Sequence, residues 1–380
     1  MPRRVVVVGA GFHGCSAALR LSNQGYEVTV IDKAYAGRHA SGVNAGGVRR
    51  LGRHPAEIPL AIAAWERWLN MTSIVGDDCG FRPVGQIKVA ENDNDMATLI
   101  ERECQVRNLG FCHETLLSRD ELYKRLPALA SHCPGGLACD GDGYANPYRT
   151  VTAWRREAER QGACFREGIE ITALEPKSNG WQLSSGGERF DADLLVNCAG
   201  AWAGEFCKWL GEPVPLTAEA PMLMITERLS PFLGTVVGAT SRPLSFKQFE
   251  NGTVLIGGGV RGVVDLARHV AETRLGGLAE NADTVVSLFP FMKEARIMRT
   301  WAGVEAVMRD HIPVIGLSSQ HDNVIHAFGF SAHGYQLGPI TGEIVADLAM
   351  EREPKLPITP FSIQRFQTPC PKQDEFTYAN

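Results

Sequence analysis

The stretch VVVVGAGFHGCSAALRLSNQGYEVTVID, Val5 to Asp32, decides the fold. Four consecutive valines are typical of a buried parallel strand, and Gly9, Gly11 and Gly14 then follow in the pattern G-x-G-x-x-G. Gly9 allows the sharp turn, Gly11 lets the backbone approach a pyrophosphate, and Gly14 brings helix and strand close together. Asp32 ends the second strand, where a carboxylate can accept hydrogen bonds from a ribose diol. The order of these features predicts a dinucleotide-binding βαβ unit.

A second glycine-rich run, SGVNAGGVR, extends from Ser41 to Arg49 and completes the predicted nucleotide site. The helix that follows the first glycine run offers unpaired N–H groups and the positive end of its dipole to phosphates. Together the two runs predict that the chain holds a flavin dinucleotide. A nicotinamide dehydrogenase is not expected, because no second dinucleotide fingerprint is visible.

Composition places the chain among ordinary soluble proteins. It has 380 residues, a net charge of -5 and 21% charged residues, which leaves no basic field for nucleic acid. We find no signal peptide and no apolar run that could span a bilayer, so we expect a cytoplasmic protein without an integral membrane segment. The ten cysteines form no C-x-x-C pair. We therefore expect reduced thiols and no metal site.

The pattern of elements predicts an α/β fold with two interleaved domains. A Rossmann-like first domain is expected from residues 1–80, 140–215 and 296–368. A second, α+β domain with an antiparallel sheet is expected from residues 81–139 and 216–295, followed by a mobile tail at 369–380. The predicted helices span residues 56–70, 93–109, 120–126, 147–162 and 271–289, and the clearest predicted strands span residues 81–90, 194–198, 221–229 and 252–260.

The carboxyl-terminal third contains another strand-to-helix turn. The segment NVIHAFGF is a predicted strand, and Gly334 to Gly338 lead into a helix expected to begin near Pro339. A helix N-terminus here would suit the negative charge that develops on a reduced flavin. An ordinary loop with proline in the first helical turn is the alternative.

Five segments also carry a resemblance to a known family. They are VVVVGAGFHG, SGVNAGGVR, LVNCAGAWAG, RTWAGVEAVMRDHIPVIG and GFSAHGYQLGPITG. The chain resembles the D-amino-acid oxidase-like superfamily of FAD enzymes, and within it the flavin subunits of opine oxidase, hydrogen cyanide synthase and proline or hydroxyproline dehydrogenases. The resemblance implies the fold of that superfamily. It also implies oxidation of a C–N bond next to a carboxylate, by hydride transfer to flavin N5.

Motifs and resemblance together give the residues expected to hold FAD. Relatives of the dimethylglycine dehydrogenase type attach FAD through a histidine where this chain has Asn44, so the cofactor is predicted to be noncovalent. The predicted FAD residues are Gly9, Gly11, Phe12, His13, Gly14, Asp32, Lys33, Ser41, Asn44, Ala45, Gly46, Gly47, Val48, Ala199, Gly200, Trp202, Trp301, Gly303, Gly334, Tyr335, Gln336 and Leu337.

On the substrate side the chain departs from its relatives. Related glycine oxidases have an arginine where this chain has Glu305, and the second carboxylate-binding arginine of the family falls at Ala332. Simple glycine-type recognition is therefore not expected. Glu305 could attract a cationic amine or guanidinium, with Arg49 or Arg309 binding the carboxylate. The alternative for Glu305 is an ion pair behind the site.

Three further residues are candidates for the substrate site. His333 and Tyr335 fall in the cofactor segment, although a structural histidine is an equal alternative. Gln248 stands beside Lys247 on a predicted strand of the second domain. Strand alternation sends these two side chains to opposite faces, so at most one of them is expected to reach the substrate.

The predicted function is an FAD-dependent dehydrogenase for an amino or imino acid, acting as the flavin subunit of a hetero-oligomer. Partner subunits would then carry FMN or an iron–sulfur cluster. A self-sufficient oxidase that produces hydrogen peroxide and a flavin-binding subunit without turnover are the alternatives. The candidate substrates are D-hydroxyproline, proline, opines, sarcosine and glycine, and we favour a cyclic or N-substituted amino acid.

Overall fold

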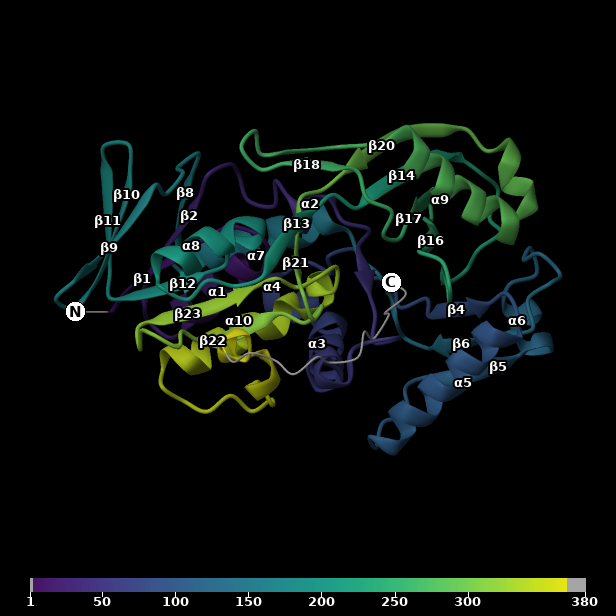
Figure 1. Ribbon diagram of the computed structural model, residues 1–380, viewed down its shortest axis with the longest axis horizontal. Coiled ribbons are helices and arrows are strands. Elements are labelled where there is room, and N and C mark those ends of the chain that lie inside the picture. The colour runs from purple at the N-terminus through teal and green to yellow at the C-terminus, as the bar shows by residue number, and fades with distance from the viewer. Residues whose placement is uncertain (1–2, 368–380) are drawn as a thin grey trace.

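The computed structural model describes residues 3–367. Its first layer is a six-stranded sheet in the order β22-β23-β12-β1-β2-β8 (Figure 1). Strands β1, β2, β8, β12 and β23 run parallel, and β22 pairs antiparallel with β23. The bounds are β1 (Arg4–Val8), β2 (Glu27–Asp32), β8 (Cys164–Glu167), β12 (Leu194–Asn197), β22 (Val314–Leu317) and β23 (Val324–Phe328). The valine run predicted as a buried strand is the centre of this sheet.

Helices α1 (Phe12–Asn23) and α10 (Gly334–Ala349) pack closely together beside the sheet. Glycines make this approach possible, because a Cβ on Gly338 would lie 2.3 Å from Phe12 and one on Gly342 would lie 2.3 Å from Ser16 Oγ. Helix α7 (Pro147–Arg160) contacts α1, and α3 (Ile58–Leu69) contacts α10. The glycine-rich turn before α1 and the turn before α10 are thereby held next to each other.

The predicted start of α7 is confirmed, and the predicted start of α10 is wrong. Pro147 is the first residue of α7, behind an Asn146 side chain that accepts a hydrogen bond from the Arg149 N–H. Helix α10, however, begins at Gly334 rather than near Pro339. Pro339 stands only six residues into the helix, so its missing N–H removes a bond to Tyr335 and spares the rest of the helix.

The second layer is an eight-stranded sheet in the order β20-β14-β17-β16-β15-β4-β6-β5. All neighbours are antiparallel except β15 and β4. In Figure 1 the helices α5, α6 and α9 lie beside it. The bounds are β4 (Gln86–Ala90), β5 (Thr115–Ser118), β6 (Gly135–Cys139), β14 (Met222–Arg228), β15 (Val236–Ala239), β16 (Ser245–Gln248), β17 (Thr253–Gly257), β20 (Ile297–Ala302), α5 (Asp93–Asn108), α6 (Arg119–Arg125) and α9 (Leu275–Leu288).

Two assignments differ here from the sequence analysis. Strand β20, placed with the first domain by its position after residue 296, is an edge strand of the second sheet because it pairs with β14. The helix expected from residue 271 begins at Leu275, because β19 (Val270–Glu272) first pairs with β18 (Val263–Asp265). Both differences arise from strand pairing that a local pattern does not reveal.

In the described part of the chain, the remaining strands form one three-stranded sheet and three two-stranded sheets. Strands β13 (Leu216–Glu219) and β21 (Glu305–Met308) form an antiparallel pair that carries part of the site described below. The others are β3 (Gly47–Val48), β7 (Gly143–Tyr144), β9 (Ala173–Lys177), β10 (Gly180–Ser185), β11 (Glu188–Ala192), α2 (Ala40–Val43), α4 (Met71–Val75), α8 (Ala203–Trp209), and the 3-10 turns η1 (Pro55–Glu57), η2 (Gly200–Trp202), η3 (Pro290–Glu294), η4 (Thr359–Phe361) and η5 (Ile363–Phe366).

Each sheet has its own hydrophobic core. One core is centred on β1, α1 and α7, and another fills the space between the second sheet, α6 and α9. Within residues 3–367, no helix combines the length and the apolarity needed to cross a membrane. The tail expected at 369–380 lies outside the described residues.

Candidate active site

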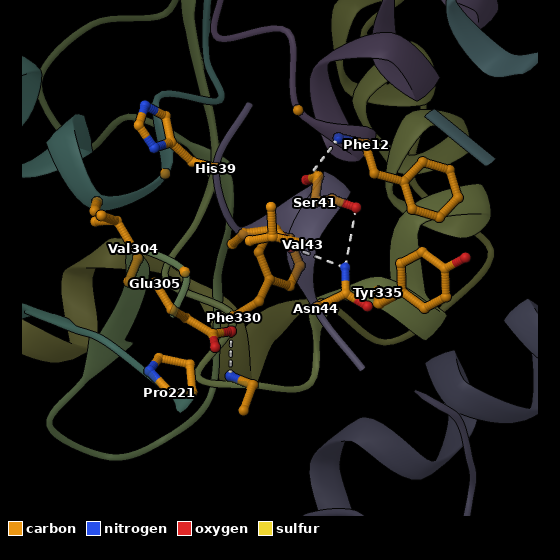
Figure 2. A pocket seen from close by; sticks show the side chains of 18 of the residues that line it. Phe12, His39, Ser41, Val43, Asn44, Pro221, Val304, Glu305, Phe330 and Tyr335 are labelled. Carbon is orange, nitrogen blue, oxygen red and sulfur yellow. Dashed lines mark hydrogen bonds between the residues drawn. The ribbon is translucent and has the colours of Figure 1, made fainter. Parts of the chain in front are cut away.

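One large cavity opens where the two layers meet. Its volume is about 580 Å³, within the range of ligand and cofactor sites. Its wall combines the turn after β1, the loop around α2, the start of α10 and side chains from β4, β16 and β21. Figure 2 shows Ser41, Glu305 and Tyr335, which come from three of these segments, around the same space.

The turn after β1 forms a cradle that excludes larger residues. Gly9 adopts a φ of +103°, and a Cβ there would lie 2.3 Å from the Cys198 carbonyl oxygen. A Cβ on Gly14 would lie 1.9 Å from the Gly9 carbonyl oxygen. Gly11 precedes α1 without any side-chain cap, and the Phe12 N–H donates to Ser41 Oγ at 2.9 Å. An uncapped helix start of this kind suits a phosphate group.

The far end of the cavity carries a carboxylate held by backbone groups. Asp32 accepts hydrogen bonds from the N–H groups of Ala10 at 2.7 Å and Ala34 at 2.8 Å. Burial raises the pKa of Asp32, and these two bonds act in the opposite direction. The side chain is thus fixed on the cavity wall, where its remaining lone pairs can accept from ribose hydroxyls.

Buried polar atoms without protein partners gather at this same end. Among the described residues, Lys33 Nζ, His39 Nε2 and Trp202 Nε1 have no hydrogen-bond partner. Lys33 Nζ lies 3.1 Å from the centroid of the Trp202 ring, and burial lowers the pKa of Lys33 to about 8. Since buried polar groups are normally satisfied, these three atoms indicate a site for a polar ligand. An adenosine moiety offers the acceptors and the flat ring that they require.

The loop after α2 is fixed from three sides. The Asn44 side chain donates to Ala40 O at 2.8 Å and accepts from the Gly46 N–H at 2.7 Å. Trp301 donates to Val43 O at 2.8 Å, and Lys247 donates to Ala45 O at 2.6 Å. The second layer therefore holds the first layer's loop in place.

The start of α10 also faces the cavity. Gly334 and Tyr335 line it, and the Tyr335 hydroxyl bonds to Thr150 Oγ1 at 2.6 Å. His333 lies behind the wall, where its Nδ1 is 3.0 Å from Glu57 Oε2. Burial lowers the pKa of His333 to about 4. This histidine braces the helix start and does not line the cavity.

The opposite part of the cavity contains charged side chains. Glu305 lines the wall, and its Oε1 accepts a hydrogen bond from the Ala332 N–H at 2.7 Å. The two positions where related glycine oxidases would carry arginines are thus bonded to each other. Arg49 also lines the wall and donates to Leu51 O at 3.1 Å.

Sequence reasoning missed Arg261, which lines the cavity as well. Its guanidinium forms an ion pair with Glu219 and donates to the Gly259 carbonyl. The available signal was its position two residues after the glycine run Gly257–Gly259 at the end of β17, where a chain can pass close to a ligand.

Most of the predicted site residues line the cavity, and the rest lie behind its wall or outside it. The side-chain amide of Gln248 forms hydrogen bonds with five backbone groups, in residues 229–233 and 252. Arg309 is exposed to solvent. The predicted residues on the wall are Gly9, Gly11, Phe12, His13, Asp32, Lys33, Ser41, Asn44, Ala45, Gly47, Arg49, Ala199, Gly200, Trp202, Gly303, Glu305, Gly334 and Tyr335. Those absent from it are Gly14, Gly46, Val48, Gln248, Trp301, Arg309, His333, Gln336 and Leu337.

Comparisons with known proteins agree with this site. A family model described as FAD dependent oxidoreductase matches residues 4–348, so the chain belongs to the DAO family of FAD-dependent oxidoreductases. The chain is 25% identical to glycine oxidase from Geobacillus kaustophilus over 387 residues, with 95% of this chain and 96% of that protein covered. It is 24% identical to a subunit of opine oxidase from Rhizobium meliloti over 373 residues, with 95% and 97% covered.

The predicted fold is confirmed in the same way. The crystal structure of L-proline dehydrogenase from P. horikoshii matches with a TM-score of 0.88 at 24% identity, covering 97% of this chain and 99% of that one. The predicted family and the predicted use of FAD are likewise confirmed by the family match. The chain is therefore an FAD-dependent oxidoreductase.

Proposed function

We propose that this protein binds FAD without a covalent bond and oxidises the C–N bond of a cyclic or N-substituted amino acid. The family match and the relatives named above support FAD-dependent oxidation of an amino-acid-like amine. The observation that carries the proposal is a single cavity with a nucleotide cradle at one end and Glu305, Arg261 and Arg49 at the other.

The cradle residues would hold the cofactor. The N-terminus of α1 and Ser41 would meet the pyrophosphate, Asp32 the ribose, and the start of α10 the flavin. Bound FAD supplies an acceptor for two electrons and a hydride. The protein would place the substrate and exclude water.

The charged residues indicate how a substrate would be oriented. Glu305 would attract the substrate amine, and Arg261 and Arg49 are two of the arginines that line the cavity and could bind a carboxylate. Arg309, the other candidate from the sequence, lies on the surface. A negatively charged Glu305 repels a carboxylate. The protein should therefore disfavour a substrate that places its carboxylate at this position.

A panel of amines tests the proposal. Purified protein is reconstituted with FAD and mixed without oxygen with proline, D-hydroxyproline, an opine, sarcosine and glycine. Loss of the flavin absorbance with a cyclic or N-substituted member supports the proposal. Equal reduction by glycine, or no reduction by any member, contradicts it.

The electron acceptor separates two forms of the function. Similarity to a subunit of opine oxidase over 95% of the chain favours a flavin subunit that passes electrons to partner chains. Similarity to glycine oxidase, also over 95% of the chain, supports the other form, a self-sufficient oxidase. Stoichiometric hydrogen peroxide from the isolated chain would support the oxidase. Turnover that needs the products of neighbouring genes would support the role in a complex, and such partners would supply any FMN or iron–sulfur cluster.

A further inference from the structure

Oxidation of a C–N bond needs the lone pair of the nitrogen, yet the amine of a free amino acid is protonated near neutral pH. The cavity must therefore bind the rare neutral form or remove a proton from the common one. We propose that Glu305 is a catalytic residue that accepts the ammonium proton of the bound substrate. This inference rests on the proposed function and assigns a chemical step to one residue of the same site.

The geometry leaves one oxygen of Glu305 available for this task. Its Oε1 is fixed by the Ala332 N–H at 2.7 Å, as the dashed line in Figure 2 shows. Ser331 and Ala332 both have positive φ, of 50° and 65°, and this unusual turn aims the N–H at the carboxylate. Within the described residues, Oε2 has no hydrogen-bond partner, while Glu305 itself lines the cavity.

The charged groups around Glu305 leave its charge uncompensated. Glu219 on β13 stands directly opposite it in the register of the β13–β21 pair. Among the described residues, Arg261 is the cation that acts on Glu305, but its guanidinium is already paired with Glu219. One arginine thus faces two carboxylates, and the group closer to the cavity wall is the one without a cation of its own.

The same surroundings tune the acidity of the group. Burial is the main cause that raises the pKa of Glu305 above its usual value, and Glu219 acts in the same direction. The Ala332 N–H and Arg261 oppose this effect without cancelling it. A carboxyl whose pKa moves toward the working pH is a better proton acceptor.

The step itself is a simple proton transfer. The N–H bond of the substrate ammonium breaks, and an O–H bond forms at Glu305. The carboxylate becomes a neutral carboxylic acid, and the ammonium becomes a neutral amine whose lone pair is free. No electrons leave the substrate in this step. The proton later returns to solvent when the product has left the cavity.

The pH dependence of kcat/KM tests this role. In the wild type, kcat/KM should rise through the pKa of Glu305 and then stay level up to the pKa of the substrate amine. In Glu305→Gln, the side chain can still accept from Ala332, but only substrate that is already neutral can react. We expect about a 10²–10³-fold loss near pH 7 and a tenfold recovery per pH unit above it, so that the two profiles converge.

Two further variants make the test specific. Glu305→Asp keeps a carboxylate and should keep the shape of the wild-type profile at a reduced rate. Glu294→Gln removes a carboxylate whose side chain is 81% exposed and should leave the profile unchanged. A loss in Glu305→Gln by one constant factor at every pH would mean that Glu305 only positions the turn, and would overturn the proposal.

A less basic substrate gives a second readout at one pH. Fluorination of the N-substituent lowers the pKa of an ammonium group, so a trifluoroethyl amine is largely neutral where its ethyl parent is charged. The penalty of Glu305→Gln should be much smaller for the trifluoroethyl substrate. Equal penalties for both would contradict proton transfer to Glu305.

If the variants do not fold, the pH dependence of kcat/KM of the wild type still tests whether the cavity contains a proton acceptor. A kcat/KM that climbs without a plateau up to the pKa of the substrate amine would exclude a proton acceptor in the cavity. Failure of every amine to reduce the flavin at any pH would refute the proposed function instead. The two failures are therefore distinguishable.

Discussion

Gly11 is a residue at which we expect the backbone to approach the cofactor closely. It precedes α1 with no side-chain cap, and a Cβ there would lie 2.9 Å from Ser41 Oγ. This position requires a residue without a side chain because of the limited space. It does not require the backbone freedom of glycine, since its φ of −69° suits any residue. Ser41 in turn accepts from the Phe12 N–H, so crowding at Gly11 would disturb both sides of the cradle.

Gly11→Val should therefore abolish FAD binding. The branched side chain would press against Ser41 and occupy the path of the pyrophosphate. Purified protein should show no flavin absorbance at roughly 450 nm after incubation with excess FAD, while its circular dichroism stays that of the wild type. Gly276→Val is the matched control, because, beyond its chain neighbours and the backbone of its own helix, no atom of residues 3–367 lies within 4 Å of a Cβ at that position. Normal flavin content in the Gly11 variant would show that the cofactor lies elsewhere.

A variant of Arg261 tests whether this residue contributes to substrate binding or to turnover. Two of its N–H groups are committed to Glu219 and Gly259, which leaves others to face the cavity. If it binds the carboxylate, Arg261→Gln should raise KM by about 10- to 100-fold with a smaller change in kcat. The same change at exposed Arg309 should alter neither constant. An unchanged KM in Arg261→Gln would leave Arg49 as the carboxylate site.

The start of α10 is held by a buried group of hydrogen-bonded residues, His333, Glu57 and Arg53, which we call the brace. His333 and Glu57 form a pair with the histidine side chain 9% exposed and the glutamate fully buried. Arg53 joins the brace by donating to the His333 carbonyl at 3.2 Å and to Gln336 at 2.7 Å. These contacts connect η1, the loop before it and α10, so they hold the helix start that lines the cavity.

His333→Ala should weaken this brace. It leaves Glu57 buried without its hydrogen-bond donor, which should lower the free energy of unfolding by about 1–3 kcal/mol in urea titrations. FAD affinity should fall as well, because the start of α10 loses support. His333→Gln keeps a donor and should recover part of the loss. A His333→Ala variant as stable as wild type would show that the pair contributes little.

The elements also show what a sequence can predict. The valine strand, the uncapped turn and the helix at residues 147–160 follow from local patterns and are confirmed. Pro339 misled the prediction of the α10 start, because proline usually marks the first helical turn, whereas here it stands at the sixth position and removes one backbone hydrogen bond. The role of Gln248 was not predictable either, since its five backbone partners come from loops that the strand pattern does not place.

At the scale of the whole molecule, the cavity exists because the two layers are joined. Lys247 lies on β16 of the second sheet and donates to the Ala45 carbonyl of the first layer's loop. No local pattern indicates this contact, which crosses 202 positions of sequence. Glu305, Arg261 and Glu219 likewise meet only through the pairing of β13 with β21 and of Pro221 with Arg261. The sequence therefore indicated the cofactor cradle better than the substrate side.

Lys247 should make stability depend on pH. Burial lowers its pKa to about 7, below the value of about 10.4 expected in the unfolded chain. Between these values the unfolded state binds more protons, so this group makes the folded state more stable as pH rises. Compared with Lys247→Met, the wild type should gain up to about 1.4 kcal/mol per pH unit between pH 7 and 9. A constant difference between the two proteins would show that Lys247 does not lose its proton in the folded state.

We infer that one cavity of this protein holds FAD beside a bound amine. The most direct measurement is an anaerobic titration of the FAD-loaded protein with N-substituted amino acids, followed by acid precipitation to release the flavin. We predict that the absorbance at roughly 450 nm is lost with about one equivalent of substrate, and that the flavin is recovered in the supernatant as FAD. A flavin that stays oxidised with every amine, or a protein that binds no FAD although it is folded, would contradict the account.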